Sequence, residues 1–141
     1  MAEFGELRVG MKGTATWLVT LETSTQRWAP DKFPDSIASF ATPDLVHLVE
    51  KAASEAAEPH LQPGWLTVGT AVDVRHLAAT PVGFTVIATA TLTEIDRRRL
   101  VFEAEVHDGV DLVGRGTHER FVVRLDQVAQ RLKEKAAKTG T

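Results

Sequence analysis

Glu50 and His76 are the two side chains whose positions suggest chemistry. Glu50 falls at the rim of the apolar face of a predicted helix, and His76 falls on the apolar side of a predicted strand. A buried imidazole needs a partner for its N–H group, and a carboxylate on a helix crossing the strand would provide one. The pair therefore suggests a carboxylate held for catalysis. The alternative is structural, with a half-exposed glutamate at a helix edge and a core histidine whose hydrogen bonds are satisfied.

The carboxylate lies on the one strong helix predicted before the C-terminal region. Residues 43–58 have the pattern of this helix, because Thr42 is a good N-cap, Pro43 suits the first helical position and Asp44 suits the first turn. At about 100° per residue, apolar side chains share one face. That face consists of Leu45, Val46, Leu48, Val49, Ala52, Ala53, Ala56 and Ala57. Asp44 and His47 lie on the polar face, where a solvated surface explains them better than a ligand pair does.

The other predicted elements are strands. Strand composition or alternation occurs in residues 13–22, 65–79, 84–95, 99–107 and 111–125. Alternation with a period of two predicts antiparallel strands that place one face on a core. On the first long strand, the alternate residues predicted to form the apolar face are Leu66, Val68, Thr70, Val72, Val74, His76 and Ala78.

An irregular segment and a second helix complete the predicted organisation. Residues 23–41 lack a regular pattern and predict a loop or flap, whereas residues 126–138 predict a surface helix. The fold class is therefore α+β, with a central helix packed on a long antiparallel sheet of about five strands and a C-terminal helix.

Bulk composition limits the classes of function. The chain has 141 residues, 43% hydrophobic and 25% charged, which predicts one domain spanning 1–141. It has no cysteine, which excludes disulfides and a thiol nucleophile and suits a cytoplasmic protein. A net charge of −3 gives no basic surface for nucleic acid, and no stretch fits a signal peptide or a membrane span. The histidines lack ligand spacing, so we expect neither a metal nor a cofactor.

The second half of the chain has a succession of motifs that resembles a known superfamily. The motifs "TPVG", "DRRR", "HDG" and "GRGTHE" follow one another between alternating strands in residues 72–123. This order resembles the hotdog-fold thioesterase superfamily, in which a central helix is wrapped by an antiparallel sheet. The resemblance extends over about residues 10–125.

Within that superfamily, the sequence is most similar to the fluoroacetyl-CoA thioesterase branch. The resemblance implies a catalytic group of Thr42 in "FATP", Glu50 in "HLVE" and His76 in "VRHLAATP". It also implies that Gly69 in "VGTA" and Arg120 in "GTHER" line the acyl site. The flap of that branch has two phenylalanines. Here "KFPDSIASF" offers Phe33 and Phe40 as substrate contacts, and Ser36 stands at the second phenylalanine position in an ungapped reading.

The resemblance implies hydrolysis of a short acyl-CoA thioester to free acid and coenzyme A. Glu50 would activate water or attack directly, His76 would orient Glu50 and move protons, and Thr42 would hydrogen-bond the substrate or a water. The helix rises about 12 Å between Thr42 and Glu50, so the two side chains of one chain cannot hydrogen-bond directly. They must flank a substrate, be joined through His76 or meet across a subunit boundary. The expected assembly is a homodimer, or a dimer of dimers.

Two other functions stay open at this point. The first is a non-catalytic hotdog module that binds an acyl ligand. The second is a hotdog hydratase or dehydratase, which needs an Asp–His pair placed for proton transfer at the α-carbon. Asp44 and His47 are the candidates for such a pair, and both face away from the predicted core.

Overall fold

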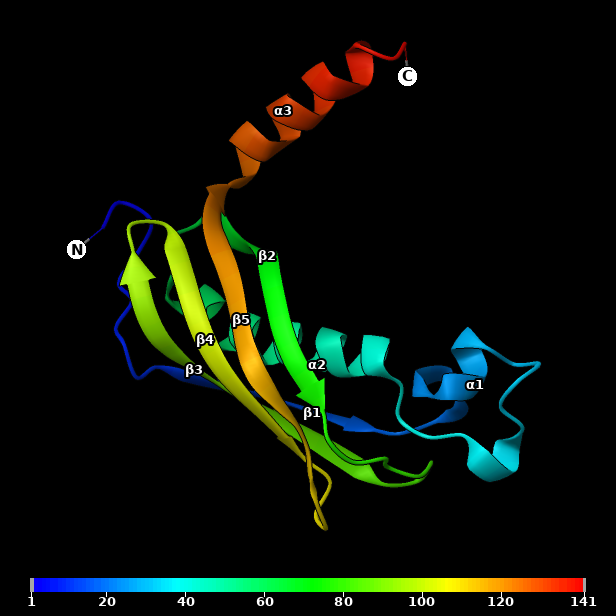
Figure 1. Cartoon of the computed structure of the whole chain (residues 1–141). Coiled ribbons are helices and arrows are strands. Elements are labelled where there is room, and N and C mark those ends of the chain that lie inside the picture. Colours follow the sequence, from blue (N-terminus) through cyan, green and yellow to red (C-terminus); the bar gives the residue numbers. More distant parts are fainter. Residues whose placement is uncertain (1, 141) are drawn as a thin grey trace.

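The computed structural model describes residues 2–140 and consists of one curved antiparallel sheet around a central helix (Figure 1). The strands are β1 (Lys12–Leu18), β2 (Trp65–His76), β3 (Thr85–Asp96), β4 (Arg99–His107) and β5 (Leu112–Arg124). The helices are α1 (Thr25–Trp28), α2 (Thr42–Ala57) and α3 (Leu125–Ala137). The strand order is β1-β3-β4-β5-β2. The predicted class, a central helix on a five-stranded antiparallel sheet with a C-terminal helix, is confirmed.

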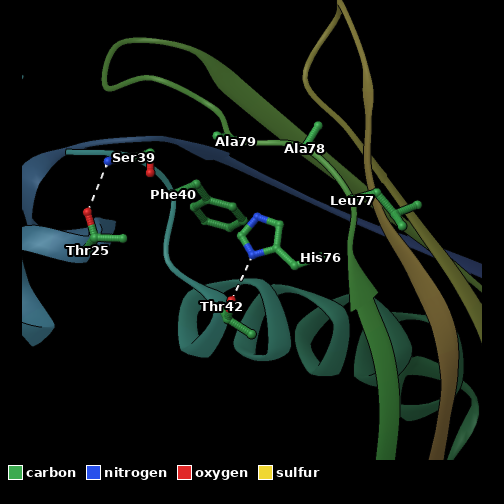
Figure 2. A pocket seen from close by; sticks show the side chains of 8 residues that line it. All are labelled: Thr25, Ser39, Phe40, Thr42, His76, Leu77, Ala78 and Ala79. Carbon is green, nitrogen blue, oxygen red and sulfur yellow. Dashed lines mark hydrogen bonds between the residues drawn. The ribbon is translucent and has the colours of Figure 1, made fainter. Parts of the chain in front are cut away.

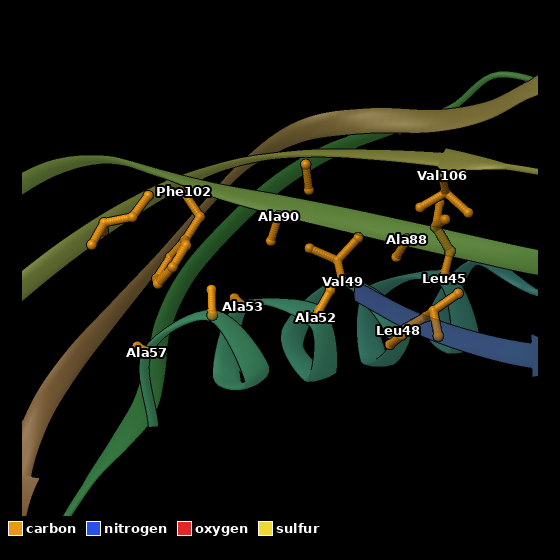
Figure 3. Packing of buried hydrophobic residues seen from close by; sticks show 14 of the residues in the cluster. Leu45, Leu48, Val49, Ala52, Ala53, Ala57, Ala88, Ala90, Phe102 and Val106 are labelled. Carbon is orange, nitrogen blue, oxygen red and sulfur yellow. The ribbon is translucent and has the colours of Figure 1, made fainter. Parts of the chain in front are cut away.

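The hydrophobic core lies between α2 and the concave face of the sheet (Figure 3). Seven of the eight apolar residues predicted for this face of α2 are fully buried, and only Val46 is half-buried. Small side chains let the helix approach the strands closely. At Gly13 on β1, an added Cβ would collide with the backbone of Ala52 and Ala56. The carboxylate on α2 is therefore carried on a helix whose distance from the sheet is fixed by close packing.

The start of α2 differs from the sequence prediction in two ways. The N-cap is Ala41, which has no side chain to cap with, and Thr42 is already the first helical residue. Asp44 was predicted to be solvated, but it is 4% exposed and accepts a hydrogen bond of 2.9 Å from Trp28 Nε1. That prediction was wrong because α1 covers this part of the polar face. His47 is exposed, as predicted, and contacts the Trp17 ring edge-on.

Residues 23–41 form a lobe beyond the N-terminal end of α2 (Figure 1). The lobe contains α1 and a 3₁₀ turn at Asp35–Ile37. It returns to the body at Phe40, which is 1% exposed and whose N–H donates to the Thr80 carbonyl at 2.9 Å. This anchor places the end of the lobe directly before α2.

Strand β2 is one edge of the sheet, and an irregularity divides it into two parts. Its pairing with β5 shifts register between Gly69 and Ala71. Before the shift, the prediction of which residues face the core is therefore wrong, because Thr67 is buried and Val68 is 38% exposed. After the shift the prediction holds for the end of the strand, where Val74 packs against the core. A β-bulge of this kind re-aims side chains, and here it turns residues from both parities toward α2.

Candidate active site

The first half of the candidate site is a pair formed by Thr42 and His76. Thr42 Oγ1 and His76 Nδ1 share a hydrogen bond of 2.8 Å, which joins the first residue of α2 to the last residue of β2 (Figure 2). Thr42 is free to make this bond because it does not cap the helix. Burial lowers the pKa of His76 from its ordinary value of 6.5, which favours the neutral imidazole.

The other ring nitrogen of His76 is unsatisfied. His76 Nε2 is buried and has no hydrogen-bond partner among residues 2–140. The Phe40 ring lies 6.4 Å away in an edge-on arrangement and offers no polar atom. A cavity of about 390 Å³ adjoins the pair, with Thr25 and Ser39 on its other side (Figure 2). The nearby Ala78 backbone raises the pKa of His76 against the larger effect of burial, but it makes no hydrogen bond of normal geometry to Nε2. An unpaired buried nitrogen costs about 1–3 kcal/mol, so this atom is suited to a further partner.

The second half of the site surrounds Glu50, about two turns further along α2. Arg120 Nη1 donates to Glu50 Oε1 at 3.4 Å, and His118 Nε2 lies 3.9 Å from the same oxygen. The Glu50 side chain is 40% exposed, whereas those of His118 and Arg120 are 1% and 8% exposed. The carboxylate thus points outward from two buried side chains, those of Arg120 and His118.

Gly69 provides the space that this arrangement needs. An added Cβ at Gly69 would collide with Glu50 Oε1 and would lie 3.3 Å from His118 Cε1 and 3.5 Å from Arg120 Nη1. Gly69 also precedes the register shift in β2, and its backbone is exposed. The absence of a side chain therefore lets the Glu50 carboxylate pack directly against β2.

Arg120 is held by a chain of hydrogen bonds that ends at Glu58. Arg120 Nε donates to Thr67 Oγ1 at 2.8 Å, and Nη2 donates to the Thr67 carbonyl at 2.9 Å. Thr67 donates from its N–H and its hydroxyl to Glu58 Oε2, both at 2.8 Å. Burial lowers the pKa of Arg120, while Glu50 and Glu58 act in the opposite direction, and the guanidinium keeps its charge. The network fixes a permanent cation beside Glu50.

His118 belongs to this network and was not identified from the sequence. Its Nδ1–H donates to the Ala71 carbonyl at 2.8 Å, and its Nε2 lies 3.1 Å from Arg120 Nη1. Burial lowers the pKa of His118 from 6.5, chiefly by desolvation. A signal was present in "GTHER", because residues two apart on a strand share a face and Arg120 was already placed at the site.

The structure corrects the expected contact between Glu50 and His76. Within one chain His76 bonds Thr42, while Glu50 bonds Arg120, and the two clusters lie at different levels of α2. Phe40 lines the cavity beside His76, whereas Phe33 is half-buried in the lobe. Ser36 is exposed.

Two further findings concern the part of the chain that the structure describes. Residues 2–140 contain no group of three or more histidine, aspartate or glutamate side chains arranged to hold a metal ion. Over the same residues, each helix is too short or too polar to span a bilayer.

Comparison with known proteins identifies one family and one fold. The family model described as fluoroacetyl-CoA-specific thioesterase matches residues 23–126. The fluoroacetyl-CoA thioesterase of Streptantibioticus cattleyicolor is 39% identical over 131 residues, which cover 92% of this chain and 94% of that protein.

Solved structures agree with this match. A mutant of a fluoroacetyl-CoA thioesterase in complex with acetyl-CoA superposes with a TM-score of 0.84 at 38% identity, covering 92% of this chain and 98% of that one. A hot-dog-like protein from Thermanaerovibrio acidaminovorans has a TM-score of 0.80 at 22% identity, with 92% and 93% of the two chains covered. The second likeness concerns the fold alone, and it confirms the predicted hotdog architecture.

Proposed function

The chain belongs to the fluoroacetyl-CoA-specific thioesterase family, and from this membership we propose that it hydrolyses a short acyl-CoA thioester to a free acid and coenzyme A. The observation that carries the proposal is the position of Glu50. Its carboxylate is partly exposed, is held by a buried arginine and lies against a glycine whose missing side chain makes room for the carboxylate itself. A thiolate is a good leaving group, so such a site needs a base or nucleophile more than a strong acid.

We assign the chemical steps to three side chains. Glu50 either removes a proton from the attacking water or attacks the thioester carbonyl to form an anhydride that water then hydrolyses. His76 is hydrogen-bonded to Thr42, and burial favours its neutral form, so it can accept a proton and pass it on. Thr42 orients the imidazole. Arg120 holds the Glu50 carboxylate in place by a hydrogen bond, and Gly69 and Phe40 line the space for the acyl group.

We further propose that the working site is formed by two copies of the chain. His76 Nε2 lacks a hydrogen-bond partner among residues 2–140, Glu50 is partly exposed, and a single chain holds the two side chains apart. The edge of β2 is exposed from Val68 to Asp73. Antiparallel pairing of two β2 strands about an axis near Val72 brings the His76 end of each copy toward the Gly69 and Glu50 end of the other. A homodimer would thus supply each half with what it lacks, and dimers could pair further into a dimer of dimers.

The acyl group and the location in the cell are inferred from less direct features. Ser36 stands where the family's flap has an aromatic residue, so we propose that short acyl groups without fluorine are also accepted. The absence of cysteine supports a cytoplasmic location.

A hydrolysis screen tests this function. The purified chain is assayed for thiol release from acetyl-, fluoroacetyl-, propionyl- and butyryl-CoA, with sedimentation velocity run on the same sample to determine its assembly. We expect turnover of at least one of these thioesters by a dimeric or larger species. Binding of an acyl-CoA without release of free thiol would contradict the proposal and would support the non-catalytic binding module instead.

A further inference from the structure

We propose that His118 is a positioning residue for thioester hydrolysis, which aims Arg120 at Glu50 by accepting a hydrogen bond through Nε2. The inference rests on the proposed function, because it assigns His118 to the same reaction. His118 does not face the substrate space itself, since its side chain is 1% exposed. Its effect on the reaction must therefore pass through the groups that it contacts.

The β-bulge in β2 determines which nitrogen of His118 carries the proton. The Ala71 carbonyl, at the register shift, accepts a hydrogen bond of 2.8 Å from His118 Nδ1. A carbonyl has no hydrogen to give, so Nδ1 must be the donor. In the neutral ring, Nε2 then has a lone pair. The bulge therefore presents a hydrogen-bond acceptor to the interior of the site.

That acceptor faces Arg120. Arg120 Nη1 lies 3.1 Å from His118 Nε2 and 3.4 Å from Glu50 Oε1, so one nitrogen divides its two N–H groups between the imidazole and the carboxylate. The other nitrogens of the guanidinium are directed at Thr67. Because the guanidinium is planar, fixing Nη1 on His118 also fixes the direction of the N–H that points at Glu50.

Burial is the main reason that His118 favours its neutral form, because desolvation lowers its pKa. Arg120 on β5 acts in the same direction, whereas the hydrogen bond to Ala71 and the charges of Glu50 on α2 and Glu119 on β5 act in the opposite direction. The ring packed against His118 from β4 is Phe102, which has no charge. A proton on Nε2 would replace the acceptor by a donor and would turn Arg120 away from Glu50. Turnover should therefore decline in acid when His118 becomes protonated.

Two substitutions separate the acceptor role from a merely structural one. In His118→Asn the amide can still donate to the Ala71 carbonyl, but no acceptor reaches Arg120. In His118→Gln the longer amide can place its oxygen near the position of Nε2. We expect kcat to fall about 100-fold in His118→Asn with KM nearly unchanged, and to recover by about tenfold in His118→Gln. His107→Asn, at an exposed histidine on β4, is the matched control and should behave like the wild-type chain.

A spectroscopic measurement tests the tautomer without turnover. In ¹⁵N NMR between pH 7 and pH 8, the His118 ring should carry its proton on Nδ1, with an unprotonated Nε2. Wild-type kcat and an unchanged pH profile in His118→Asn would overturn the proposal while leaving Glu50 in its role. A ring protonated on Nε2 would overturn it as well. If the wild-type chain hydrolyses no thioester, the proposed function fails, and the NMR result alone decides whether the contact between His118 and Arg120 exists as described.

Discussion

The two halves of the candidate site differ in how completely one chain builds them. Around Glu50, the side chains of Arg120, His118 and Thr67 form a continuous network in which each buried group has partners. At the start of α2, Thr42 and His76 share one hydrogen bond beside a cavity, and within the described residues His76 Nε2 has no hydrogen-bond partner. The half around Glu50 is complete within one chain, whereas the half around His76 still has an unpaired nitrogen.

This difference corresponds to two tasks in catalysis, which are orienting a carboxylate and transferring a proton. A carboxylate that must stay correctly oriented needs a fixed environment, which a network of buried hydrogen-bonded side chains provides. An imidazole that must accept and release a proton needs a nitrogen free to meet a substrate, a water or a second carboxylate. The completed half therefore suits the proposed base or nucleophile, and the incomplete half suits the proposed proton carrier.

Removing the charge from the completed half should have the largest effect. Glu50→Gln keeps the size of the side chain and a carbonyl oxygen for Arg120, but it cannot act as a base or nucleophile. We expect kcat/KM for acyl-CoA hydrolysis to fall about 1,000-fold with the fold intact. Glu55→Gln, at an exposed glutamate on the same helix, is the control. Equal rates in the two variants would remove Glu50 from the mechanism.

Filling the space beside the carboxylate should have the next largest effect. In Gly69→Ala the new methyl group displaces the Glu50 carboxylate, which is the flexible end of its side chain, so the fold should survive. We expect kcat to fall about 100-fold with little change in the melting temperature. Thr85→Ala, at an exposed position on β3, is the control and should leave kcat unchanged. A large loss of stability in Gly69→Ala with normal activity per folded chain would mean that Gly69 serves packing alone.

Breaking the single hydrogen bond of the incomplete half should have a smaller effect. Thr42→Val removes the hydroxyl and leaves His76 Nδ1 unpaired, which we expect to lower kcat about tenfold. Thr42→Ser keeps the hydroxyl and should stay near the wild-type rate. Because Ala41 and not Thr42 is the N-cap, any loss of stability in Thr42→Val, measured as a drop in melting temperature, should come from the unpaired imidazole. It should be at most about 1–3 kcal/mol and should accompany the fall in kcat. A clear drop in melting temperature without loss of activity would indicate a capping role instead.

Low pH should lower the stability of the fold through the histidines of both halves, His76 and His118. Burial lowers the pKa values of His76 and His118 below 6.5, so the unfolded chain binds protons more readily than the folded one as the pH falls through that value. Their contribution to stability is present above about pH 6.5 and is lost below it. Melting temperatures between pH 8 and pH 5 should decline below pH 6.5, and less steeply in His118→Gln than in His107→Gln. Parallel curves for these two variants would contradict the assignment for His118.

The sequence was sufficient for the elements and for the separate site residues, but not for how the site residues meet. Alternation and helical periodicity placed the strands and α2 within a few residues, because both patterns follow from burial on one face. The prediction of which β2 residues face the core failed at Val68, because a β-bulge cannot be recognised from the alternation of apolar and polar residues. Thr42 was expected to cap α2, and local pattern alone could not reveal that a histidine on a distant strand uses its hydroxyl. His118 was missed because its role depends on Ala71, far away in the sequence.

Subunit complementation tests whether each working site combines Glu50 of one copy with His76 of another. Glu50→Gln and His76→Asn are purified, unfolded together in equal amounts and refolded, and hydrolysis is compared with that of each variant alone. Random pairing makes about half of the dimers mixed, and each mixed dimer contains one site with both wild-type residues. If the site is shared, the mixture should show about a quarter of the wild-type rate, and either variant alone should show about a hundredth or less. A mixture no faster than the average of the two variants would contradict a site shared between copies.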